Sequence, residues 1–163
     1  MKAIQIQTYG SADVMTLDDV PMVACEANGL LVRVVAAGVN PVDWKIRSGA
    51  MAQQLPKKFP ITLGQDAAGI VVEVGSASSD FKLGDEVFFY ADFMHGGTYA
   101  EYVAVAAAQV ALKPHTVPFA AAAALPTAGQ AAWTALLTRP KSNAACTFWC
   151  MAARARWAQS PYS

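Results

Sequence analysis

The late part of this sequence lacks two residue types that the earlier part uses freely. No glycine follows Gly129, and no aspartate or glutamate follows Glu101. A loop that wraps the pyrophosphate of a dinucleotide needs glycine, because only a residue without Cβ lets the backbone come close to the phosphates. The residues after 129 therefore contain no glycine turn of that kind.

Charge is divided unevenly along the chain. Residues 1–138 carry eight lysine and arginine residues against twelve acidic ones, a balance of −4, whereas residues 139–163 carry four basic residues and no acid. Four positive charges without basic and aromatic side chains alternating on one face do not form a nucleic-acid-binding patch. We therefore expect no nucleic-acid partner.

Cysteines and long apolar runs are also scarce. Cys25, Cys146 and Cys150 are odd in number and unclustered, which argues against a disulfide framework. No run of about 18 apolar residues is present to span a bilayer. Met1–Thr8 alternates like a strand and has no apolar core of the kind found in signal peptides. These absences predict a soluble protein, cytoplasmic in location, with no membrane partner.

Six segments have the composition and spacing of β-strands. In each, β-branched and aromatic residues are bounded by clusters of glycine, proline, aspartate or serine. At this spacing the strands predict a compact, barrel-like β domain. The segments are Lys2–Thr8, Leu30–Ala37, Gly69–Val74, Asp85–Tyr90, Thr98–Val105 and Gln109–Lys113.

The pattern changes from strand to helix near Pro118. Phe119–Leu125 and Thr127–Leu137 are rich in alanine and leucine, and Pro118 and Pro126 stand where first-turn prolines stand. A further helical turn is predicted over residues 43–48. The predicted fold class is therefore mainly β with short helices (α+β).

Five motifs follow one another in an order that points to a family. The sequence resembles the medium-chain dehydrogenase/reductase superfamily, and within it the zinc-free quinone oxidoreductase (zeta-crystallin-like) branch, over residues 1 to about 138. The motifs are Gly38–Asp43 (GVNPVD), Gly64–Gly75 (GQDAAGIVVEVG), Phe81–Val87 (FKLGDEV), Gly97–Tyr102 (GTYAEY) and Leu125–Trp133 (LPTAGQAAW).

The resemblance implies a domain organisation. Residues 1–125 would form the N-terminal GroES-like catalytic domain, a partly open β-barrel. Residues 126–138 would form a helix that leads toward a Rossmann domain, which in this family follows the barrel and binds the cofactor. Members are often dimers, so a homo-oligomer is a further expectation.

The resemblance also implies an activity, namely hydride transfer from NADPH to a quinone or an α,β-unsaturated carbonyl (enone). Without a metal, this reduction needs hydrogen-bond donors for the oxygen that gains negative charge. The family position matching Asn40 faces the nicotinamide and the substrate, so Asn40 is the implied catalytic and cofactor-binding residue. Thr127 matches a position that contacts the nicotinamide side.

Structural interpretations of the same residues stay open. Asn40 precedes Pro41 and is equally a turn or cap residue, and Thr127 could cap the helix that follows Pro126. Asp43 and Trp44 could line the substrate pocket, but the helical turn over 43–48 accounts for Asp43 as well. Tyr99 and Tyr102 fit aromatic positions on a sheet face.

A zinc alcohol dehydrogenase is the nearest competing branch. Catalytic zinc needs thiolate, imidazole or carboxylate ligands. Where zinc-containing members carry cysteine this chain has Asn40, and where they carry His-Glu it has Gln65 and Asp66. We therefore expect no metal. The alternatives are a relative of zinc alcohol dehydrogenases that has lost its metal, or a cofactor-free binding module.

Residues 139–163 depart from the family pattern, and we interpret them as a frameshifted tail. Reading the nucleotides one base earlier forces glycine at Met151/Ala152 and at Trp157/Ala158, because methionine and tryptophan have one codon each. These glycines match the cofactor turn of the family. A frame lost near Arg139–Lys141 would leave the chain truncated before the cofactor-binding fold and inactive alone. Without the glycine turn, we expect this chain to bind NADPH poorly. The alternative is a native extension.

Overall fold

The computed structural model describes residues 1–134, except for residues 57, 79 and 93–96. It divides the chain into two units, Met1–Thr127 and Ala128–Ser163. The atypical tail predicted at 139–163 lies outside the described residues, as does the end of the helix predicted to run to residue 137.

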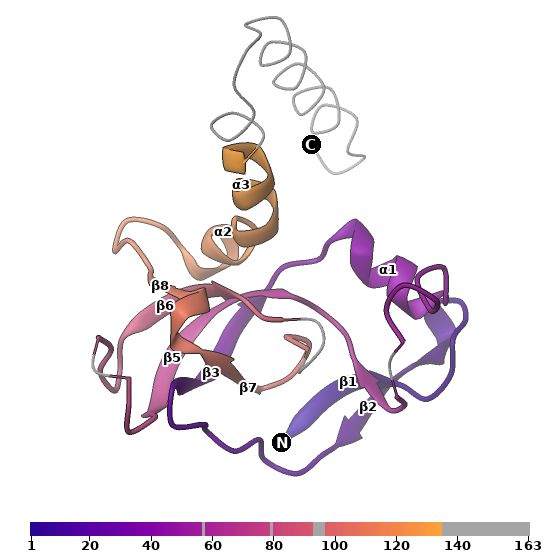
Figure 1. The fold of residues 1–163 in the computed structure, drawn as a ribbon, viewed down its shortest axis with the longest axis horizontal. Coiled ribbons are helices and arrows are strands. Elements are labelled where there is room, and N and C mark those ends of the chain that lie inside the picture. The colour runs from indigo at the N-terminus through magenta and orange to yellow at the C-terminus, as the bar shows by residue number, and fades with distance from the viewer. Residues whose placement is uncertain (57, 79, 93–96, 135–163) are drawn as a thin grey trace, which may run out of the picture. The chain divides into compact units, whose positions relative to one another are not determined.

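The first unit is built on two antiparallel sheets (Figure 1). A three-stranded sheet has the order β2-β1-β4, and a five-stranded sheet has the order β7-β3-β5-β6-β8. An isolated bridge between Ala3 and Ala100 connects β1 to the segment before β7. The strands are β1 (Lys2–Ile6), β2 (Met15–Asp19), β3 (Gly29–Ala37), β4 (Ile61–Thr62), β5 (Asp66–Val74), β6 (Glu86–Tyr90), β7 (Tyr102–Ala106) and β8 (Val110–Leu112).

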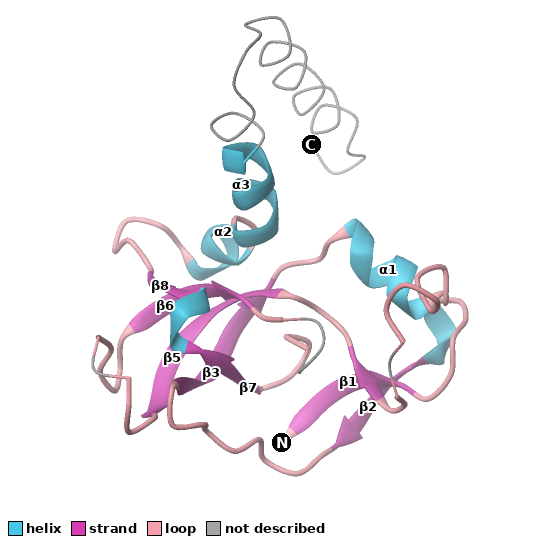
Figure 2. Cartoon of the chain, viewed as in Figure 1, coloured by secondary structure: helices cyan, strands magenta, loops and turns pink. Residues whose placement is uncertain are grey.

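Three short α-helices (Figure 2) and two single-turn 3-10 helices, Ala12–Val14 and Ala107–Gln109, complete the elements of the described residues. The α-helices are α1 (Pro41–Arg47), α2 (Phe119–Ala123) and α3 (Pro126–Trp133). The predicted fold class, mainly β with short helices, is confirmed, and the described strands form two sheets rather than a closed barrel. The helical turn predicted over 43–48 begins two residues earlier, because Pro41 has the backbone angle that a first helical turn requires.

Some strand boundaries differ from the sequence-based prediction. The strand expected over Thr98–Val105 begins only at Tyr102, because the preceding backbone bonds to other segments: Tyr99 N donates to Leu63 O, and Tyr99 O accepts from Ile4 N. Strand β2 was not predicted. It lies at a sheet edge with four of its five residues exposed, and it ends in Asp18 and Asp19, a residue type that strands disfavour.

The main hydrophobic core lies on one face of the five-stranded sheet. Alternate residues of β3, β5, β6 and β7 contribute to it, as the two-residue period of a strand requires. A second cluster packs helix α2 on the same sheet, where Ala122 and Ala123 contact Ala68. Its small side chains bring the helix close: a Cβ on Gly38 would meet the carbonyl of Ala123.

A buried lysine joins β8 to the segment that precedes α2. Lys113 Nζ lies 2.9 Å from Glu86 Oε2, and its side chain is 4% exposed. The same ammonium donates to the carbonyls of Val117 (2.8 Å) and Pro114 (3.2 Å) and lies 4.9 Å from the ring centroid of Phe119. Lys113 therefore holds the segment that leads into α2.

Replacing Lys113 by methionine is expected to lower the free energy of unfolding by about 1.5–3 kcal/mol, the range for a hydrogen-bonded charged group. Methionine keeps the aliphatic stem but leaves the two carbonyls without their donor. Urea unfolding of the wild type and the variant measures the loss. The exposed Lys82 provides the matched control, and equal stability losses in Lys82→Met and Lys113→Met would contradict the assignment.

Candidate functional site

Three segments distant in sequence meet at the carboxylate of Asp66, the first residue of β5. Asn40 comes from the corner between β3 and α1, and Thr127 from the first turn of α3. Asp66 is fully buried, with 0% of its surface exposed. Its main chain is also held, because its carbonyl accepts hydrogen bonds from Gly38 N (2.8 Å) and Thr98 Oγ1 (3.0 Å).

The two oxygens of Asp66 receive three donors. Asn40 Nδ2 donates to Oδ2 at 3.0 Å. Thr127 donates twice, from its backbone N to Oδ2 at 3.0 Å and from Oγ1 to Oδ1 at 2.7 Å. The first N–H groups of a helix have no partner within it, so Asp66 satisfies one of them at the start of α3. The carboxylate also lies where the helix dipole favours negative charge.

A second carboxylate holds the backbone of Asn40. Asp43 is 4% exposed, and its Oδ2 accepts from Asn40 N at 2.6 Å and from Tyr99 Oη at 3.0 Å. Asn40 O accepts in turn from Asp43 N at 3.0 Å. Asn40 is thus held at its backbone by Asp43 and at its side chain by Asp66.

Burial is the main reason why the pKa of Asp43 is raised above its ordinary value, and the nearby charge of Asp66 adds to the effect. Hydrogen bonds from Asn40 N, Tyr99 Oη and the N–H of Gly64 act in the opposite direction. The pKa of the Tyr99 hydroxyl is raised by its own burial and by the carboxylate of Asp43. Tyr99 therefore stays a proton donor to Asp43.

Comparison with known proteins identifies the domain. The alcohol dehydrogenase GroES-like domain model matches residues 26–115, which is more than half of the chain. The chain belongs to this GroES-like domain family.

Sequence relatives and solved structures show which members of the family this GroES-like domain resembles. The chain is 39% identical over 137 residues to a chloroplast envelope quinone oxidoreductase homolog of Arabidopsis thaliana, covering 83% of this chain and 42% of the relative. It is 41% identical over 135 residues to an NADPH-dependent alkenal/one oxidoreductase of the same plant, covering 78% of this chain and 35% of that relative. Among solved structures, the quinone oxidoreductase of Coxiella burnetii superposes on this chain with a TM-score of 0.80 at 38% identity. The match covers 85% of this chain and 44% of that structure.

These matches confirm the resemblance to the quinone oxidoreductases of the medium-chain dehydrogenase/reductase superfamily. The chain spans less than half the length of the relatives that it matches. Both plant relatives carry a chloroplast location in their names, and a cytoplasmic location for this chain stays a prediction.

The GroES-like domain brings together three of the four predicted site residues. Asn40, Asp43 and Thr127 belong to one hydrogen-bonded network, in which Asn40 also caps α1 as the structural interpretation proposed. Thr127 is the second residue of α3 and not its cap. Trp44 lies apart from the network, 51% exposed on α1, with Lys45 Nζ 5.9 Å from its ring centroid.

Sequence reasoning missed two members of the network, Asp66 and Tyr99. Asp66 was considered only as a replacement for a zinc ligand, and Tyr99 only as an aromatic residue of a sheet. A signal for Asp66 was available, because an acidic residue directly precedes the apolar run Ala67–Val72 at the start of a buried strand. Buried acidic residues are rare unless they have partners.

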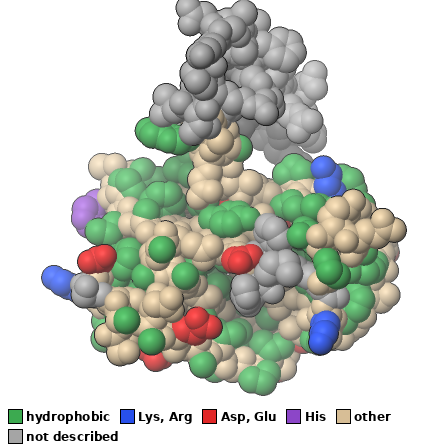
Figure 3. All heavy atoms as spheres, in the orientation of Figure 1, with side chains coloured by type: hydrophobic (Ala, Val, Ile, Leu, Met, Phe, Trp, Pro, Cys, Tyr) green, Lys and Arg blue, Asp and Glu red, His purple; other side chains and the backbone are tan. Residues whose placement is uncertain are grey.

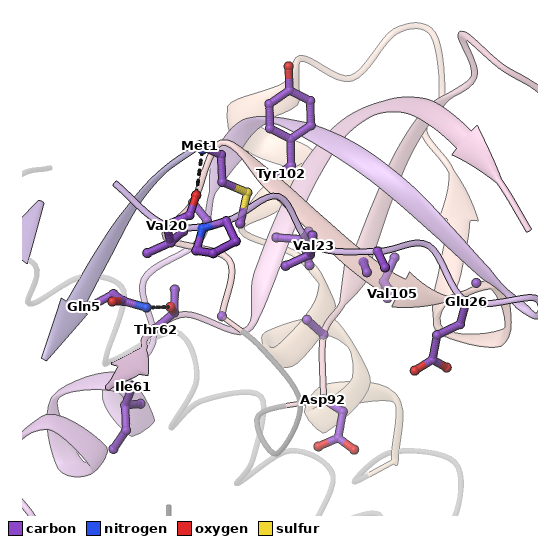
Figure 4. A pocket seen from close by; sticks show the side chains of 18 of the residues that line it. Met1, Gln5, Val20, Val23, Glu26, Ile61, Thr62, Asp92, Tyr102 and Val105 are labelled. Atoms are coloured by element: carbon purple, nitrogen blue, oxygen red, sulfur yellow. Dashed lines mark hydrogen bonds between the residues drawn. The ribbon is translucent and has the colours of Figure 1, made fainter. Parts of the chain in front are cut away.

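A cavity of about 900 Å³ lies elsewhere in the domain (Figure 4). Asn40, Asp66 and Thr127 do not line it. It is bordered by two hydrogen-bonded pairs, Gln5 with Thr62 and the N-terminal amine with the carbonyl of Val20. Its other labelled lining residues include Val23, Glu26, Ile61, Asp92, Tyr102 and Val105.

The surface of the described residues shows no concentrated basic patch on the face drawn in Figure 3, where the lysine and arginine side chains lie apart at the margins. Within residues 1–134, apart from the six that are not described, no group of three or more His, Cys, Asp or Glu residues could hold a metal ion. The same part of the chain has no helix long and apolar enough to cross a membrane. The absence of zinc stays a prediction.

The raised pKa of Asp43 predicts a pH dependence of stability. The Asp43 carboxyl group binds its proton more tightly in the folded protein than in the unfolded chain. Protonated Asp43 therefore stabilises the fold, and this stabilisation is fully present below the ordinary pKa of 3.8. It is lost as pH rises through the raised folded value. Asp43→Asn removes the titrating group. Urea unfolding at a series of pH values should show that the stability of the variant rises relative to that of the wild type as pH rises through this window.

The matched control is Asp19→Asn, because Asp19 is 78% exposed and paired only with Lys2 at 3.1 Å. This control removes a carboxylate that contacts neither Asn40 nor Tyr99. Parallel profiles for wild type and Asp43→Asn across the window would show that Asp43 does not titrate as described.

Proposed function

We propose that this GroES-like domain forms the substrate-side wall of a zinc-free, NAD(P)H-dependent oxidoreductase that reduces quinones or α,β-unsaturated carbonyls. The observation that carries the proposal is the convergence of Asn40 and Thr127 on the buried carboxylate of Asp66. The names of the relatives support it, since one is a quinone oxidoreductase homolog and another an NADPH-dependent alkenal/one oxidoreductase.

The donor set fits this chemistry. One amide proton of Asn40 is used by Asp66, and the second remains for the substrate oxygen as it gains negative charge. An amide donates this hydrogen bond without titrating. When bound, NADPH would supply the hydride, and Asn40 and Thr127 would hold its nicotinamide end.

Exposed apolar residues flank the polar network in the sequence. Val39, directly before Asn40, is 81% exposed, and Leu125, two residues before Thr127, is 49% exposed. Quinone and nicotinamide rings are flat and largely apolar, and sites for such groups combine apolar walls with a few polar contacts. The same exposed residues favour the second candidate, a cofactor-free module that binds a partner protein.

Chemical-shift mapping tests the two candidates on this chain. The ¹⁵N-labelled protein is titrated with NADPH and, separately, with a soluble benzoquinone up to millimolar concentration. Shifts centred on the Asn40 side-chain amide and the Thr127 backbone amide are expected. Thr127→Val should weaken NADPH binding by about 2–10-fold, the loss of one hydrogen bond, whereas Thr116→Val, at an exposed position before α2, should not.

Because a chain without the glycine turn should hold NADPH poorly, the quinone titration decides. Millimolar benzoquinone that leaves both amides unshifted would remove support for the oxidoreductase function. The binding-module candidate would then be favoured, and it predicts partner binding that survives Asn40→Ala. A charged residue at the position of Leu125 should abolish that binding.

We also propose that residues 139–163 were read in a shifted frame, which would leave the chain inactive as an oxidoreductase. Sequencing the gene across codons 135–145 tests this directly. An inserted or deleted base relative to a frame that encodes the glycine turn is expected. An uninterrupted frame, with no family-like sequence in the alternative one, would establish a native extension.

A further inference from the structure

The buried carboxylate of Asp66 connects two residues that the proposed function uses. The Asn40 donor lies 26 positions before it in the sequence, and the Thr127 donors lie 61 positions after it. All of these donors are neutral. Within the described residues, neither of the two ion pairs of the domain involves Asp66. The charge of Asp66 is therefore stabilised by neutral hydrogen-bond donors and by the start of α3, without an ion pair.

An ionised carboxylate only accepts hydrogen bonds, so it determines how each partner is oriented. The amide of Asn40 must present Nδ2 to Asp66, because the reverse orientation would bring its carbonyl oxygen against the carboxylate. Thr127 must direct its single hydroxyl proton at Oδ1. The side-chain oxygen of Asn40 belongs to the capping box of α1. What remains outside these contacts is one N–H of Asn40, and only lone pairs on Thr127 Oγ1.

We propose that Asp66 is a positioning residue that sets the hydrogen-bond polarity of the site, with Asn40 presented as a donor and Thr127 as an acceptor. The ligand assignment rests on the proposed function. The free N–H of Asn40 meets the carbonyl oxygen of the quinone or enone. Thr127 Oγ1 accepts from a group that donates, such as the carboxamide N–H of a nicotinamide.

Satisfying the first turn of α3 does not by itself require a charged residue at this position. Burying an ionised carboxylate is costly, and a neutral asparagine side chain could also accept a hydrogen bond from the first turn of α3. A neutral amide at position 66 would, however, accept and donate equally well. Asn40 could then flip its amide, and Thr127 could turn its proton outward.

Asp66→Asn is a suitable variant because it preserves shape, and the main-chain contacts of Asp66 do not depend on its side-chain charge. The readout is ¹⁵N NMR of the full chain. In the wild type we expect a single Asn40 side-chain amide signal pair and a Thr127 backbone amide protected from hydrogen exchange. In Asp66→Asn, we expect Asn40 to show two exchanging orientations and the Thr127 amide to exchange about tenfold faster.

Asp19→Asn provides the control, because it removes an exposed carboxylate and should leave both signals unchanged. A folded Asp66→Asn protein that keeps a single Asn40 orientation and full Thr127 protection would overturn the proposal.

A second pair of variants keeps the test decisive if Asp66→Asn does not fold. Thr127→Val removes one donor to the carboxylate, and Thr127→Ser restores it. Through the shared carboxylate, valine should shift the Asn40 side-chain amide signals and serine should return them toward the wild-type positions. Identical Asn40 signals in the valine and serine variants would refute the coupling.

NADPH titration separates this inference from the proposed function. If Asp66→Asn alters Asn40 and Thr127 as expected but neither NADPH nor benzoquinone shifts either group in the wild type, the oxidoreductase function fails and the positioning role stands. If NADPH binds the wild type and Asp66→Asn equally tightly, the assignment of Asn40 as donor and Thr127 as acceptor to the ligand is wrong. The expected result is binding about 5–10-fold weaker in Asp66→Asn.

Discussion

Replacing Gly64 by alanine is expected to lower the free energy of unfolding by about 2–5 kcal/mol. Gly64 has a φ of +91°, a left-handed conformation that costs an L-residue about 1–2 kcal/mol. A Cβ at this position would also lie 2.7 Å from Cε1 of Tyr99 and against Oγ1 of Thr98. Displacing packed side chains adds about 1–3 kcal/mol.

Gly84 offers a control that separates the two costs. Its φ is +88°, but a Cβ there would meet no atom within 4 Å. Gly84→Ala should therefore lower the free energy of unfolding only by the cost of the left-handed backbone conformation, about 1–2 kcal/mol. Guanidinium unfolding of both variants measures the difference. Equal losses of unfolding free energy in the two variants would show that the side chains of Thr98 and Tyr99 do not exclude a Cβ at position 64.

The crowding at Gly64 reaches the candidate site directly. Thr98 donates to the carbonyl of Asp66, and Tyr99 donates to the carboxylate of Asp43. An alanine at position 64 pushes on both donors, so a Gly64→Ala protein that still folds should also show altered Asn40 amide signals. Gly64 thus links the packing of the corner before β5 to the geometry of the site.

Local patterns predicted most of the fold because most strands bury one face. The β-branched run at 30–37 and the segment at 85–90 became β3 and β6 almost unchanged. Strands β2 and β4 escaped prediction for physical reasons. Met15–Asp19 is largely exposed and ends in two aspartates, which strands disfavour, while Ile61–Thr62 is too short to show a period.

The candidate site could be predicted only in part, because its hydrogen bonds join segments far apart in sequence. Asn40 and Thr127 were found through the family resemblance, and Asp43 through its place beside Asn40. The role of Asp66 depends on both partners arriving at one point, and no local pattern encodes that. Tyr99 was missed for the same reason: its partner Asp43 is 56 residues away.

Phe89→Ala and Phe88→Ala should have effects that differ in size and in place, although the residues are neighbours on β6. Phe89 is 1% exposed in the main core, so its removal should cost about 3–5 kcal/mol of unfolding free energy. Phe88 points to the opposite face of the sheet, where it is half-buried and packs against the cluster that holds Ala68, Ala122 and Ala123. Its removal should cost about 1–2 kcal/mol.

The place of the effect follows from what each face supports. Without Phe88 of β6, helix α2 loses part of its packing on the five-stranded sheet, and the chain from α2 onward carries Thr127 to Asp66. Native-state hydrogen exchange should therefore show the Thr127 amide opening locally in Phe88→Ala, while the amides of β3 and β5 keep their protection relative to global stability. In Phe89→Ala, protection should fall across the whole sheet. If Phe88→Ala lowered all amides together, α2 and the Asp66 contact would belong to the same cooperative unit as the core, and the site could not be loosened without unfolding the domain.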